Sequence, residues 1–429
     1  MADRLGNAVL AAYRLAGRAM TPILPWALSR RARRGKEDAA RIDERYGRAS
    51  VKRPPGRVVW VHAASVGETN AVLPLIKRLV ETGLAVVFTS VTVTSAGIAA
   101  TRLPQGAQHQ FAPIDVPSAV EGFIAHWRPE LVLFVESELW PTTLSALRDR
   151  GIPLVLVNAR LSERSFRGWQ RFGMVAHALV GRLSLCLAQS TQDAERYRTL
   201  GVKDVRITGN LKFDVPAPDV DPVALAAFRG MTDGRPVWVA ASTHAGEEAI
   251  AAAVHRVLRR QFPNVLTVIV PRHPERGAEI RNEIAASGLS VAQRRLAEPV
   301  LPITDIYVAD TLGELGLFYR AAPVAFLGGS LVEKGGQNPI EPLRLGCVAL
   351  HGPHVHNFSD IYAAIDAAVP KVAIGYADEL ASRVAEMLAD PEIARQRAEK
   401  LAGALKPLSG ALNATMTALQ PYLEKGTRS

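Results

Sequence analysis

Short hydrophobic runs alternate with segments of helical period through residues 57–210. Strand-like runs lie at 57–64, 85–90, 108–112, 131–135, 154–157, 184–188 and 205–208. Between them apolar residues recur with the period of an amphipathic helix, as in 70–82, 116–127 and 191–200. This alternation predicts a parallel, doubly wound α/β sheet.

The same pattern restarts at Pro236. Strands are expected at 237–241, 265–270, 306–309, 324–326 and 348–350, and helices at 246–261, 275–287, 340–345 and, charged and alanine-rich, within 376–404. An apolar run followed by Ala-Ala-Ser and then Gly-Glu occurs at 58–68 and again at 237–247. Each half therefore begins with its own first strand, which predicts two Rossmann-like domains.

The domain boundaries follow from this repeat. The proline-rich, polar stretch 214–221 has the composition of a linker. We predict an N-terminal membrane-associated segment at 1–50, a first domain at 51–215, a linker at 216–222 and a second domain at 223–429. The two domains are expected to face each other across a cleft, with the last helices closing the second one.

Composition places the chain among globular proteins of two or three domains. It has 429 residues, of which 48% are hydrophobic, so disorder is not expected. The two cysteines, Cys186 and Cys347, lack metal-ligand spacing, and Cys186 lies in an apolar run that predicts a buried thiol. Nothing in this cysteine usage requires an oxidising compartment, which favours a cytosolic location.

Most of the positive charge lies at one end of the chain. The net charge is +10, and residues 1–53 hold 13 Lys or Arg against 5 Asp or Glu. The basic run 30–36 follows an apolar segment, 8–28, that Arg14 and Arg18 interrupt. This segment is too interrupted to span a membrane, and we expect it to lie on an anionic membrane surface. A soluble helix with a solvated basic face is the alternative. Nucleic acid is not an expected partner, because aromatic residues are not interleaved there.

Segment 58–69 carries the clearest catalytic candidate. A β-branched run ends in small residues that include Ser65 and Gly67, and Glu68 follows where a helix is expected. Open α/β sheets bind ligands at such strand-to-helix turns. The positive end of the helix dipole favours an ionised carboxylate there, so Glu68 is predicted to be charged and to act as a base.

A second acidic segment follows the run 131–135. Glu136 and Glu138 are two residues apart, so in an extended chain both point the same way and can face the cleft with Glu68. Lys212 follows the last strand of the first half, where its ammonium can meet a phosphate. Alternatively, a carboxylate pairs with an arginine or caps a helix, and Lys212 is an ordinary surface lysine.

The second half supplies candidates for binding an anion. Arg272 and His273 follow a strand and open a helix, and a guanidinium group suits a phosphate. The Gly-Gly-Ser turn at 328–330 permits close backbone approach, and the turn at 338–341 begins a helix whose free N–H groups attract anions. Purely structural glycines are the alternative for the first of these turns.

Missing motifs exclude two classes of enzyme. No glycine-rich loop ending in Gly-Lys-Ser or Gly-Lys-Thr is present, which argues against a P-loop NTPase. No Gly-x-Gly-x-x-Gly follows the first strand, which argues against a dehydrogenase. Glycosyl transfer without a metal or another cofactor fits better, because arginine, lysine and helix N-termini can stabilise a leaving phosphate.

Taken in order, the motifs resemble those of the bacterial Kdo transferases, which attach 3-deoxy-octulosonic acid (Kdo) to the lipid A precursor. The resemblance runs nearly end to end. It rests on HAASVGE at 62–68, ESELWP at 136–141, GNLKFD at 209–214, PRHPER at 271–276, DTLGEL at 310–315 and the stretch from GGS at 328–330 to EP at 341–342.

The resemblance implies a GT-B fold and inverting transfer from CMP-Kdo to lipid IVA at the cytoplasmic face of the inner membrane, in lipopolysaccharide synthesis. It implies that Glu68 is the base and that Glu138 and Lys212 stabilise the transition state. The residues implied to contact substrates are Ser65, Gly67, Arg272, His273, Gly313, Glu314, Leu315, Gly329, Ser330, Asn338, Pro339, Ile340 and Glu341. Many relatives have His where this chain has Gln337, which affects a peripheral contact.

Two other functions stay open at this point. One is a transferase or epimerase that acts on another nucleotide sugar with the same two-domain plan. The other is a non-catalytic adaptor at the membrane surface, which would have no need of Glu68 and Glu138. Arg160, Arg164 and Arg167 are candidates for binding the Kdo carboxylate, and at least one of them is expected to be structural.

Overall fold

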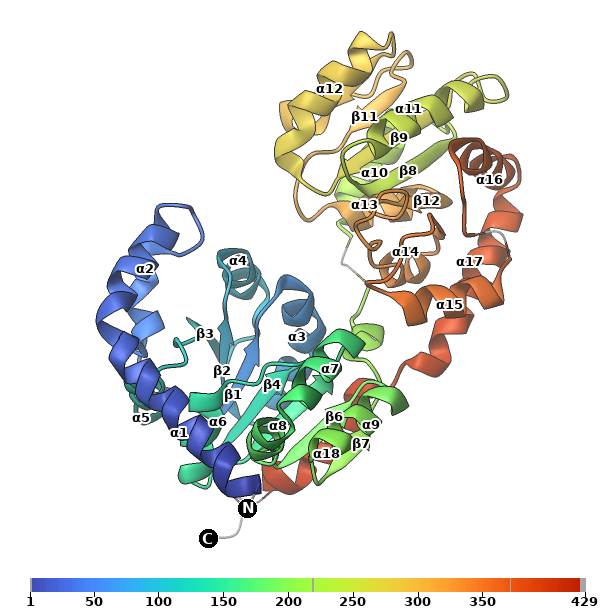
Figure 1. Cartoon of the computed structure of the whole chain (residues 1–429). Helices are drawn as coiled ribbons and strands as arrows, with labels where there is room; N and C mark the ends of the chain where they lie inside the picture. Colours follow the sequence, from blue (N-terminus) through green and yellow to red (C-terminus); the bar gives the residue numbers. More distant parts are fainter. Residues whose placement is uncertain (1, 218–219, 371, 425–429) are drawn as a thin grey trace. The chain divides into compact units, whose positions relative to one another are not determined.

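The computed structural model describes residues 2–217, 220–370 and 372–424 (Figure 1). The chain divides into two compact units: unit 1 is Met1–Val215 with Leu408–Ser429, and unit 2 is Pro216–Pro407. Each unit contains one parallel sheet with helices packed on it. Of the predicted linker, residues 218 and 219 lie outside the described part of the chain, and α10 (Pro222–Thr232) begins at its last residue.

Unit 1 has a seven-stranded sheet of order β3-β2-β1-β4-β5-β6-β7. Every strand lies within two residues of its predicted run: β1 Val58–Ala63, β2 Ala85–Ser90, β3 Ala107–Phe111, β4 Leu131–Val135, β5 Leu154–Ala159, β6 Leu185–Ala188 and β7 Val205–Ile207. The strand order reverses between β1 and β4. In open α/β sheets ligands bind at this switch point, beyond the carboxyl ends of the strands.

Helices cover both faces of this sheet because alternate strand residues point to opposite sides. Phe134 of β4 packs in one core with Trp60 and Trp127, whereas its neighbour Leu133 packs in the other with Phe88. The covering helices are α3 Val66–Glu81, α4 Val93–Arg102, α5 Pro117–Trp127, α6 Pro141–Asp149, α7 Glu163–Arg171, α8 Gly173–Val180 and α9 Thr191–Leu200.

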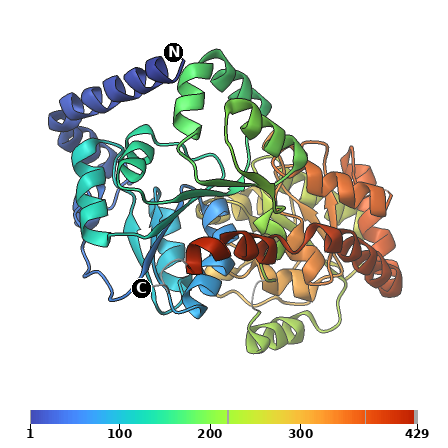
Figure 2. The same ribbon diagram turned by 90° about the horizontal axis from the view of Figure 1, so that it is seen from below.

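The N-terminal segment forms two helices, α1 (Ala2–Met20) and α2 (Leu24–Ala32), separated by a turn at Thr21–Ile23. Pro22 and Pro25 are the second residues of the turn and of α2, in the first turn of each element, which their fixed φ favours. Helix α1 lies beside α8 (Figure 2), and Leu10 is buried there. Among the described residues, no helix is both long and apolar enough to cross a bilayer.

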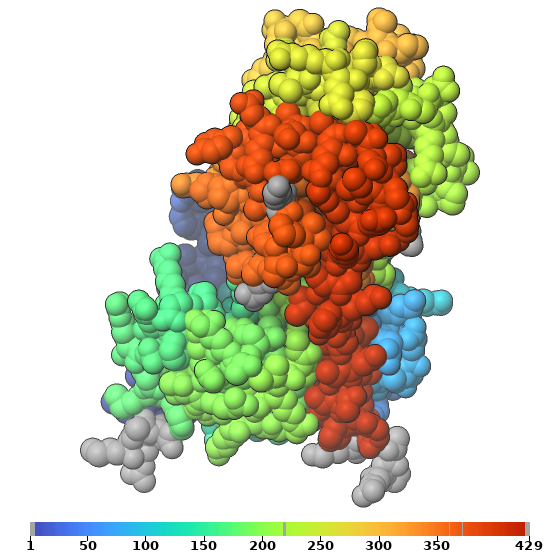
Figure 3. Space-filling view, turned by 90° about the vertical axis from the view of Figure 1, so that its right-hand side faces the viewer, coloured from blue at the N-terminus to red at the C-terminus, as the bar shows by residue number. Residues whose placement is uncertain are grey.

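The C-terminal helices are divided between the two units, which differs from the second domain expected at 223–429. Helices α16 (Ala377–Ala389) and α17 (Pro391–Leu405) belong to unit 2, but α18 (Ala411–Glu424) packs on unit 1 (Figure 3). Leu419 of α18 lies in the core that contains Leu187 of β6. The apolar face of a helix packs on whichever apolar surface is uncovered. The local sequence pattern does not reveal which domain provides that surface.

Unit 2 has a six-stranded sheet of order β10-β11-β9-β8-β12-β13. Its strands are β8 Val237–Thr243, β9 Leu266–Pro271, β10 Val291–Gln293, β11 Ile306–Val308, β12 Val324–Leu327 and β13 Val348–His351. Strand β10 was not predicted; it has three residues and lies at the edge of the sheet. The order reverses between β8 and β12, which gives this unit its own switch point.

The two units repeat an internal contact that reflects their matching first strands. Trp60 Nε1 of β1 donates to Thr89 Oγ1 of β2 at 2.8 Å, and Trp238 Nε1 of β8 donates to Thr267 Oγ1 of β9 at 2.7 Å. The expected pair of Rossmann-like domains is confirmed. Helices α11 Glu247–Leu258, α12 Gly277–Ala286, α13 Leu315–Ala321, α14 Ile340–Arg344 and α15 Ser359–Ala368 complete unit 2.

Candidate active site

Glu68 lies in the first turn of α3, at the switch point of unit 1. Ser65 is the N-cap of this helix, and its Oγ accepts from the Glu68 backbone N–H at 3.3 Å. The Glu68 carboxylate in turn accepts from Ala64 N at 2.8 Å and from Ser65 Oγ at 2.7 Å. This reciprocal arrangement is a capping box, and it fixes the direction of the carboxylate. A Cβ at Gly67 would meet only Ser65 Oγ, at 3.9 Å, so the space over this turn is open.

The surroundings of Glu68 oppose the ionised form that the helix dipole favours. The pKa of its carboxyl is raised above 4.5, first by burial and then by the nearby carboxylates of Glu136 and Glu138, against the hydrogen bonds from Ser65 and Ala64. The helix dipole alone suggested a firmly ionised group. Burial and like charges outweigh it, because both disfavour the ionised form. A raised carboxyl pKa makes a stronger base once the proton is lost.

Glu136 and Lys212 form an ion pair at the same switch point. Lys212 Nζ lies 3.0 Å from Glu136 Oε1, and each side chain is about one-fifth exposed, at 21% and 19%. Glu136 has a left-handed φ of 59°, so the chain after β4 is not extended as we had assumed. Lys212 therefore contacts the three glutamates at this site through Glu136. The ammonium group partly neutralises the negative charge of Glu136 beside Glu68.

Glu138 is held by an aromatic pair. Its Oε2 accepts from Trp140 Nε1 at 2.7 Å and lies 3.8 Å from His62 Nε2, while the His62 and Trp140 rings are 4.4 Å apart. Burial acts to raise the pKa of the Glu138 carboxyl, but His62 and Trp140 outweigh it, and the pKa is lowered. Glu138 is thus the more readily ionised partner of Glu68.

His62 is a functional candidate that the sequence did not single out, because it lies within an apolar strand. It is fully buried, and burial lowers its pKa against the opposing effect of Glu138. Its Nδ1 lies 2.9 Å from Thr89 Oγ1, and its Nε2 has no hydrogen-bond partner. In the tautomer in which Thr89 donates to Nδ1, Nε2 carries the proton and faces Glu138.

In unit 2 the glycine turn differs from its expected role. The backbone N–H groups of Gly329, Ser330 and Leu331 donate to the carboxylate of Glu247, at 2.7, 3.2 and 3.1 Å. Glu247 is buried and also accepts from His244 N at 2.9 Å. These N–H groups are therefore already bound to an internal anion. Glu247 is the counterpart of Glu68 in the repeated motif, and here the carboxylate holds the turn at the β8–β12 switch point.

Basic side chains gather beside this turn. Arg272 and His273 are exposed at the end of β9, and the His273 ring lies 5.8 Å from that of His244. Burial lowers the pKa of His244, Glu247 opposes this, and the charges of His273, Arg272 and Lys334 lower it further. The cluster has the positive character that a phosphate requires. His244 and Lys334 are members that we did not predict.

The remaining predicted contacts lie on two turns of unit 2. Gly313 has a φ of +84° and is followed by Glu314, whose carboxylate pairs with Arg294. The hydrogen bond from Arg294 is the main reason why the pKa of the Glu314 carboxyl is lowered. Leu315 begins α13. Because its carboxylate is paired with Arg294, Glu314 is more suited to holding the turn in place than to acting as a free acid.

The turn before α14 is held by Asn338. Its Oδ1 accepts from Ile340 N at 3.1 Å, and its Nδ2 lies 3.4 Å from Glu341 Oε1. Pro339 and Ile340 are buried. The Asn338–Glu341 contact orients Glu341, which the resemblance implied to contact substrates. No group of three or more His, Cys, Asp or Glu suited to a metal ion occurs in the part of the chain that was described.

Comparison with known proteins identifies the family. The family model of 3-deoxy-D-manno-octulosonic-acid transferase (kdotransferase) matches residues 40–215. The 3-deoxy-D-manno-octulosonic acid transferase of Bordetella pertussis is 36% identical over 428 residues, which cover 96% of this chain and 99% of that protein. The Haemophilus influenzae enzyme is 34% identical, over 90% and 92% of the two chains. The chain belongs to the Kdo transferase family.

Solved structures agree on the fold. A glycosyltransferase from Rickettsia africae superposes with a TM-score of 0.54 at 11% identity, over 88% of this chain and all of that one. UDP-GlcNAc 2-epimerase from Neisseria meningitidis gives 0.55 at 13% identity, over 86% of this chain. At such identities the likeness shows the fold alone, and it is the GT-B type that the motifs implied. As a Kdo transferase the protein is a glycosyltransferase, and Glu68, Glu136, Glu138 and Lys212 all lie within the matched residues 40–215.

Proposed function

We propose that the protein transfers Kdo from CMP-Kdo to the lipid A precursor lipid IVA, with inversion and without a metal ion. The acceptor hydroxyl gives its proton to Glu68, its oxygen bonds to the anomeric carbon of Kdo, and the bond from that carbon to the CMP phosphate oxygen breaks. CMP leaves as a phosphate monoester with the electron pair. Inversion follows because the hydroxyl attacks on the face opposite the leaving phosphate.

The observation that carries this proposal is the setting of Glu68. A half-buried carboxylate at a switch point, fixed by a capping box and with a raised pKa, meets the requirements of a general base. Lys212 and Glu138 are proposed to stabilise charge in the transition state beside it. On the donor side, the basic cluster with Arg272 and His273 supports binding of the CMP phosphate.

Further donor contacts are proposed for two turns. The turn at Gly313, Glu314 and Leu315 and the turn from Asn338 through Pro339 and Ile340 to Glu341 would hold the cytidine nucleoside. The Asn338 contact that orients Glu341 supports a role in binding ribose hydroxyls. Ser65 and Gly67 are proposed to border the acceptor, because the space above their turn is open.

The test is incubation with CMP-Kdo and tetraacylated lipid IVA, followed by mass spectrometry of the products. Glu68→Gln should lower turnover by roughly 10²–10⁴-fold, because general-base help contributes that much, while the Kd for CMP stays unchanged. Glu81→Gln, at the exposed end of the same helix, is the matched control. Full activity of Glu68→Gln would exclude it as the base. UDP-sugars in place of CMP-Kdo test the alternative donors, EDTA tests metal independence, and no turnover on any donor would favour the adaptor.

We further propose that the N-terminal helices bind the cytoplasmic face of the inner membrane. Trp26 is 65% exposed and Leu15 66% exposed, and the exposed Arg30, Arg33 and Arg34 follow closely. Apolar side chains beside cations suit an anionic bilayer surface. Sedimentation with phosphatidylglycerol vesicles should exceed sedimentation with phosphatidylcholine vesicles and should fall as salt rises. Equal binding to both vesicles would contradict an electrostatic contribution.

A further inference from the structure

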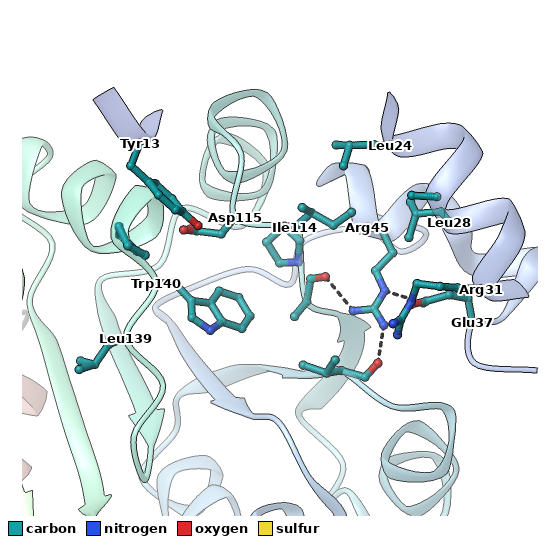
Figure 4. Close-up of a pocket in the computed structure, with 15 residues that line it drawn as sticks. Tyr13, Leu24, Leu28, Arg31, Glu37, Arg45, Ile114, Asp115, Leu139 and Trp140 are labelled. Carbon is teal, nitrogen blue, oxygen red and sulfur yellow. Dashed lines mark hydrogen bonds and ion pairs between the residues drawn. The ribbon is translucent and has the colours of Figure 1, made fainter. Parts of the chain in front are cut away.

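A pocket of about 500 Å³ lies in unit 1 beneath α2 (Figure 4). We call it the α2 pocket. Leu24 and Leu28 of α2 form one wall, Ile114 after β3 forms another, and Leu139 and Trp140 after β4 form a third. Its size falls in the range of small-molecule sites. No residue that the sequence proposed for the substrates lines it.

The carboxylates that line the α2 pocket already have hydrogen-bond partners within the protein. Glu37 accepts from Arg31 at 2.7 Å and from Arg45 at 2.8 Å. At the other end, Asp115 accepts from the backbone N–H groups of Thr142 and Thr143 and from the Tyr13 hydroxyl. The carboxylates of Glu37 and Asp115 are therefore satisfied within the protein, and burying a further polar group beside them would cost free energy. What the pocket offers is apolar surface.

The surroundings of the pocket indicate what kind of apolar group enters. Exposed Ile23, at the end of the turn before α2, and exposed Trp26 of α2 adjoin the lining residues Leu24 and Ala27 in sequence. The Arg30 guanidinium lies 5.7 Å from the centre of the Trp26 ring. Exposed Arg33 and Arg34 follow. An apolar pocket bordered by cations fits an amphiphile with an acyl chain and an anionic head group.

Trp140 connects the α2 pocket to the candidate active site. The same indole that lines the pocket donates to Glu138 Oε2 at 2.7 Å and packs on the His62 ring. A ligand in the pocket therefore touches the residue that positions a proposed catalytic carboxylate. A bulk membrane lipid would have no reason to lie against that residue, whereas the acceptor must reach it.

We infer that the α2 pocket binds one acyl chain of the lipid acceptor; this inference rests on the proposed function. The bound chain places the sugar head group over the turn of Glu68, and Trp140 is the positioning residue between the chain and Glu138. The acceptor is then recognised by its acyl chain as well as by its sugar. An acceptor without acyl chains loses this contribution.

The test uses Ala27→Phe, which fills the pocket from α2, and Ser29→Phe, which adds the same ring on the exposed side of that helix. Transfer from CMP-Kdo is measured to tetraacylated lipid IVA and to its deacylated sugar. Ala27→Phe should lower kcat/KM for the acylated acceptor at least 10-fold and leave the deacylated acceptor unchanged. Ser29→Phe should leave both unchanged. An equal ratio of the two acceptors in Ala27→Phe and in the unmodified protein would overturn the inference.

A second readout does not depend on turnover. Five of the six tryptophans remain in a Trp26→Phe background, so the emission of Trp140 is the difference between that variant and Trp26→Phe with Trp140→Phe. An acceptor with brominated acyl chains should quench this difference, and Ala27→Phe should abolish the quenching. Quenching without any Kdo transfer would support the pocket and reject the proposed function. Transfer without quenching would reject the pocket alone. Quenching by brominated phosphatidylglycerol but not by the brominated acceptor would assign the pocket to a membrane lipid and overturn the inference.

Discussion

Lys212 Nζ lies 3.0 Å from Glu136 Oε1, and this pair stands beside Glu68 at the carboxyl edge of the first sheet. The two residues are far apart in sequence, and two strands separate β4 from β7 in the sheet. The chain after β7 returns across the strand ends, where Leu211 N donates to Asn158 Oδ1 of β5 at 2.9 Å, and this places Lys212 beside Glu136. Glu136 was expected to face the cleft together with Glu138. Its contact with Lys212 instead makes it the group that links the proposed phosphate-facing cation to the proposed base.

The first prediction concerns the pH dependence of transfer. A general base must be ionised, so kcat/KM should rise with pH up to the raised pKa of Glu68 and then level off. Glu136→Gln removes a neighbouring negative charge, so the pKa of Glu68 should fall and the acidic limb should move to lower pH. Glu130→Gln, at the opposite end of β4, is the control. An unmoved limb in Glu136→Gln would mean that another group titrates.

The second prediction concerns Glu247. Four backbone N–H groups donate to this buried carboxylate, so Glu247→Ala leaves them without an acceptor. We expect a loss of roughly 3 kcal/mol in the free energy of unfolding, and weaker CMP binding because the glycine turn loses its support. Urea denaturation and calorimetric CMP titration measure the two effects. Glu333→Ala, on the exposed loop, should change neither the stability nor the affinity.

The third prediction concerns acid stability. Burial, then Arg41 and Arg45, lower the pKa of His109 to about 3. Between this value and the unfolded value of 6.5, the unfolded chain binds a proton that the folded chain does not, so stability falls as pH decreases. His109→Gln removes this proton, and its melting temperature should decline less between pH 7 and pH 5. His126→Gln, on the exposed surface, should follow the unmodified protein. Parallel declines in both variants would contradict the assignment.

The fourth prediction concerns the attachment of α18. The Asp214 carboxylate accepts from the backbone N–H groups of Gly410 and Leu412, at 2.7 and 2.5 Å, and so caps the start of this helix. Asp214→Ala should cost about 1 kcal/mol, as removal of an N-cap does. Hydrogen exchange should rise in α18 and β6 but not in β8. Asp204→Ala, whose side chain only pairs with Arg206 on the surface, is the control. Equal exchange in both variants would show that the cap contributes nothing.

Local sequence patterns were enough to predict all the strands except β10, several of the helices and the repeated first strand of the two domains. Those properties are local, because apolar side chains recur every 2 residues in a strand and every 3.6 residues in a helix, and both periods can be read from a short stretch of sequence. The sequence also placed Glu68 correctly at a helix start, since the small residues before it signal a strand end. The one missed strand, β10, has three residues, too few to show a period.

The partners of the acids and the shifts of their pKa values depend on the three-dimensional arrangement of the chain. The pKa of Glu68 depends on Glu136 and Glu138, which follow another strand, and the N–H groups of the glycine turn are bound by Glu247 from a different segment. The packing of α18 on unit 1 and the lining of the α2 pocket likewise depend on contacts between segments that are distant in sequence. Charge interaction and burial act through space, so they are settled by which strand ends and helix faces meet, and no stretch of consecutive residues contains that information.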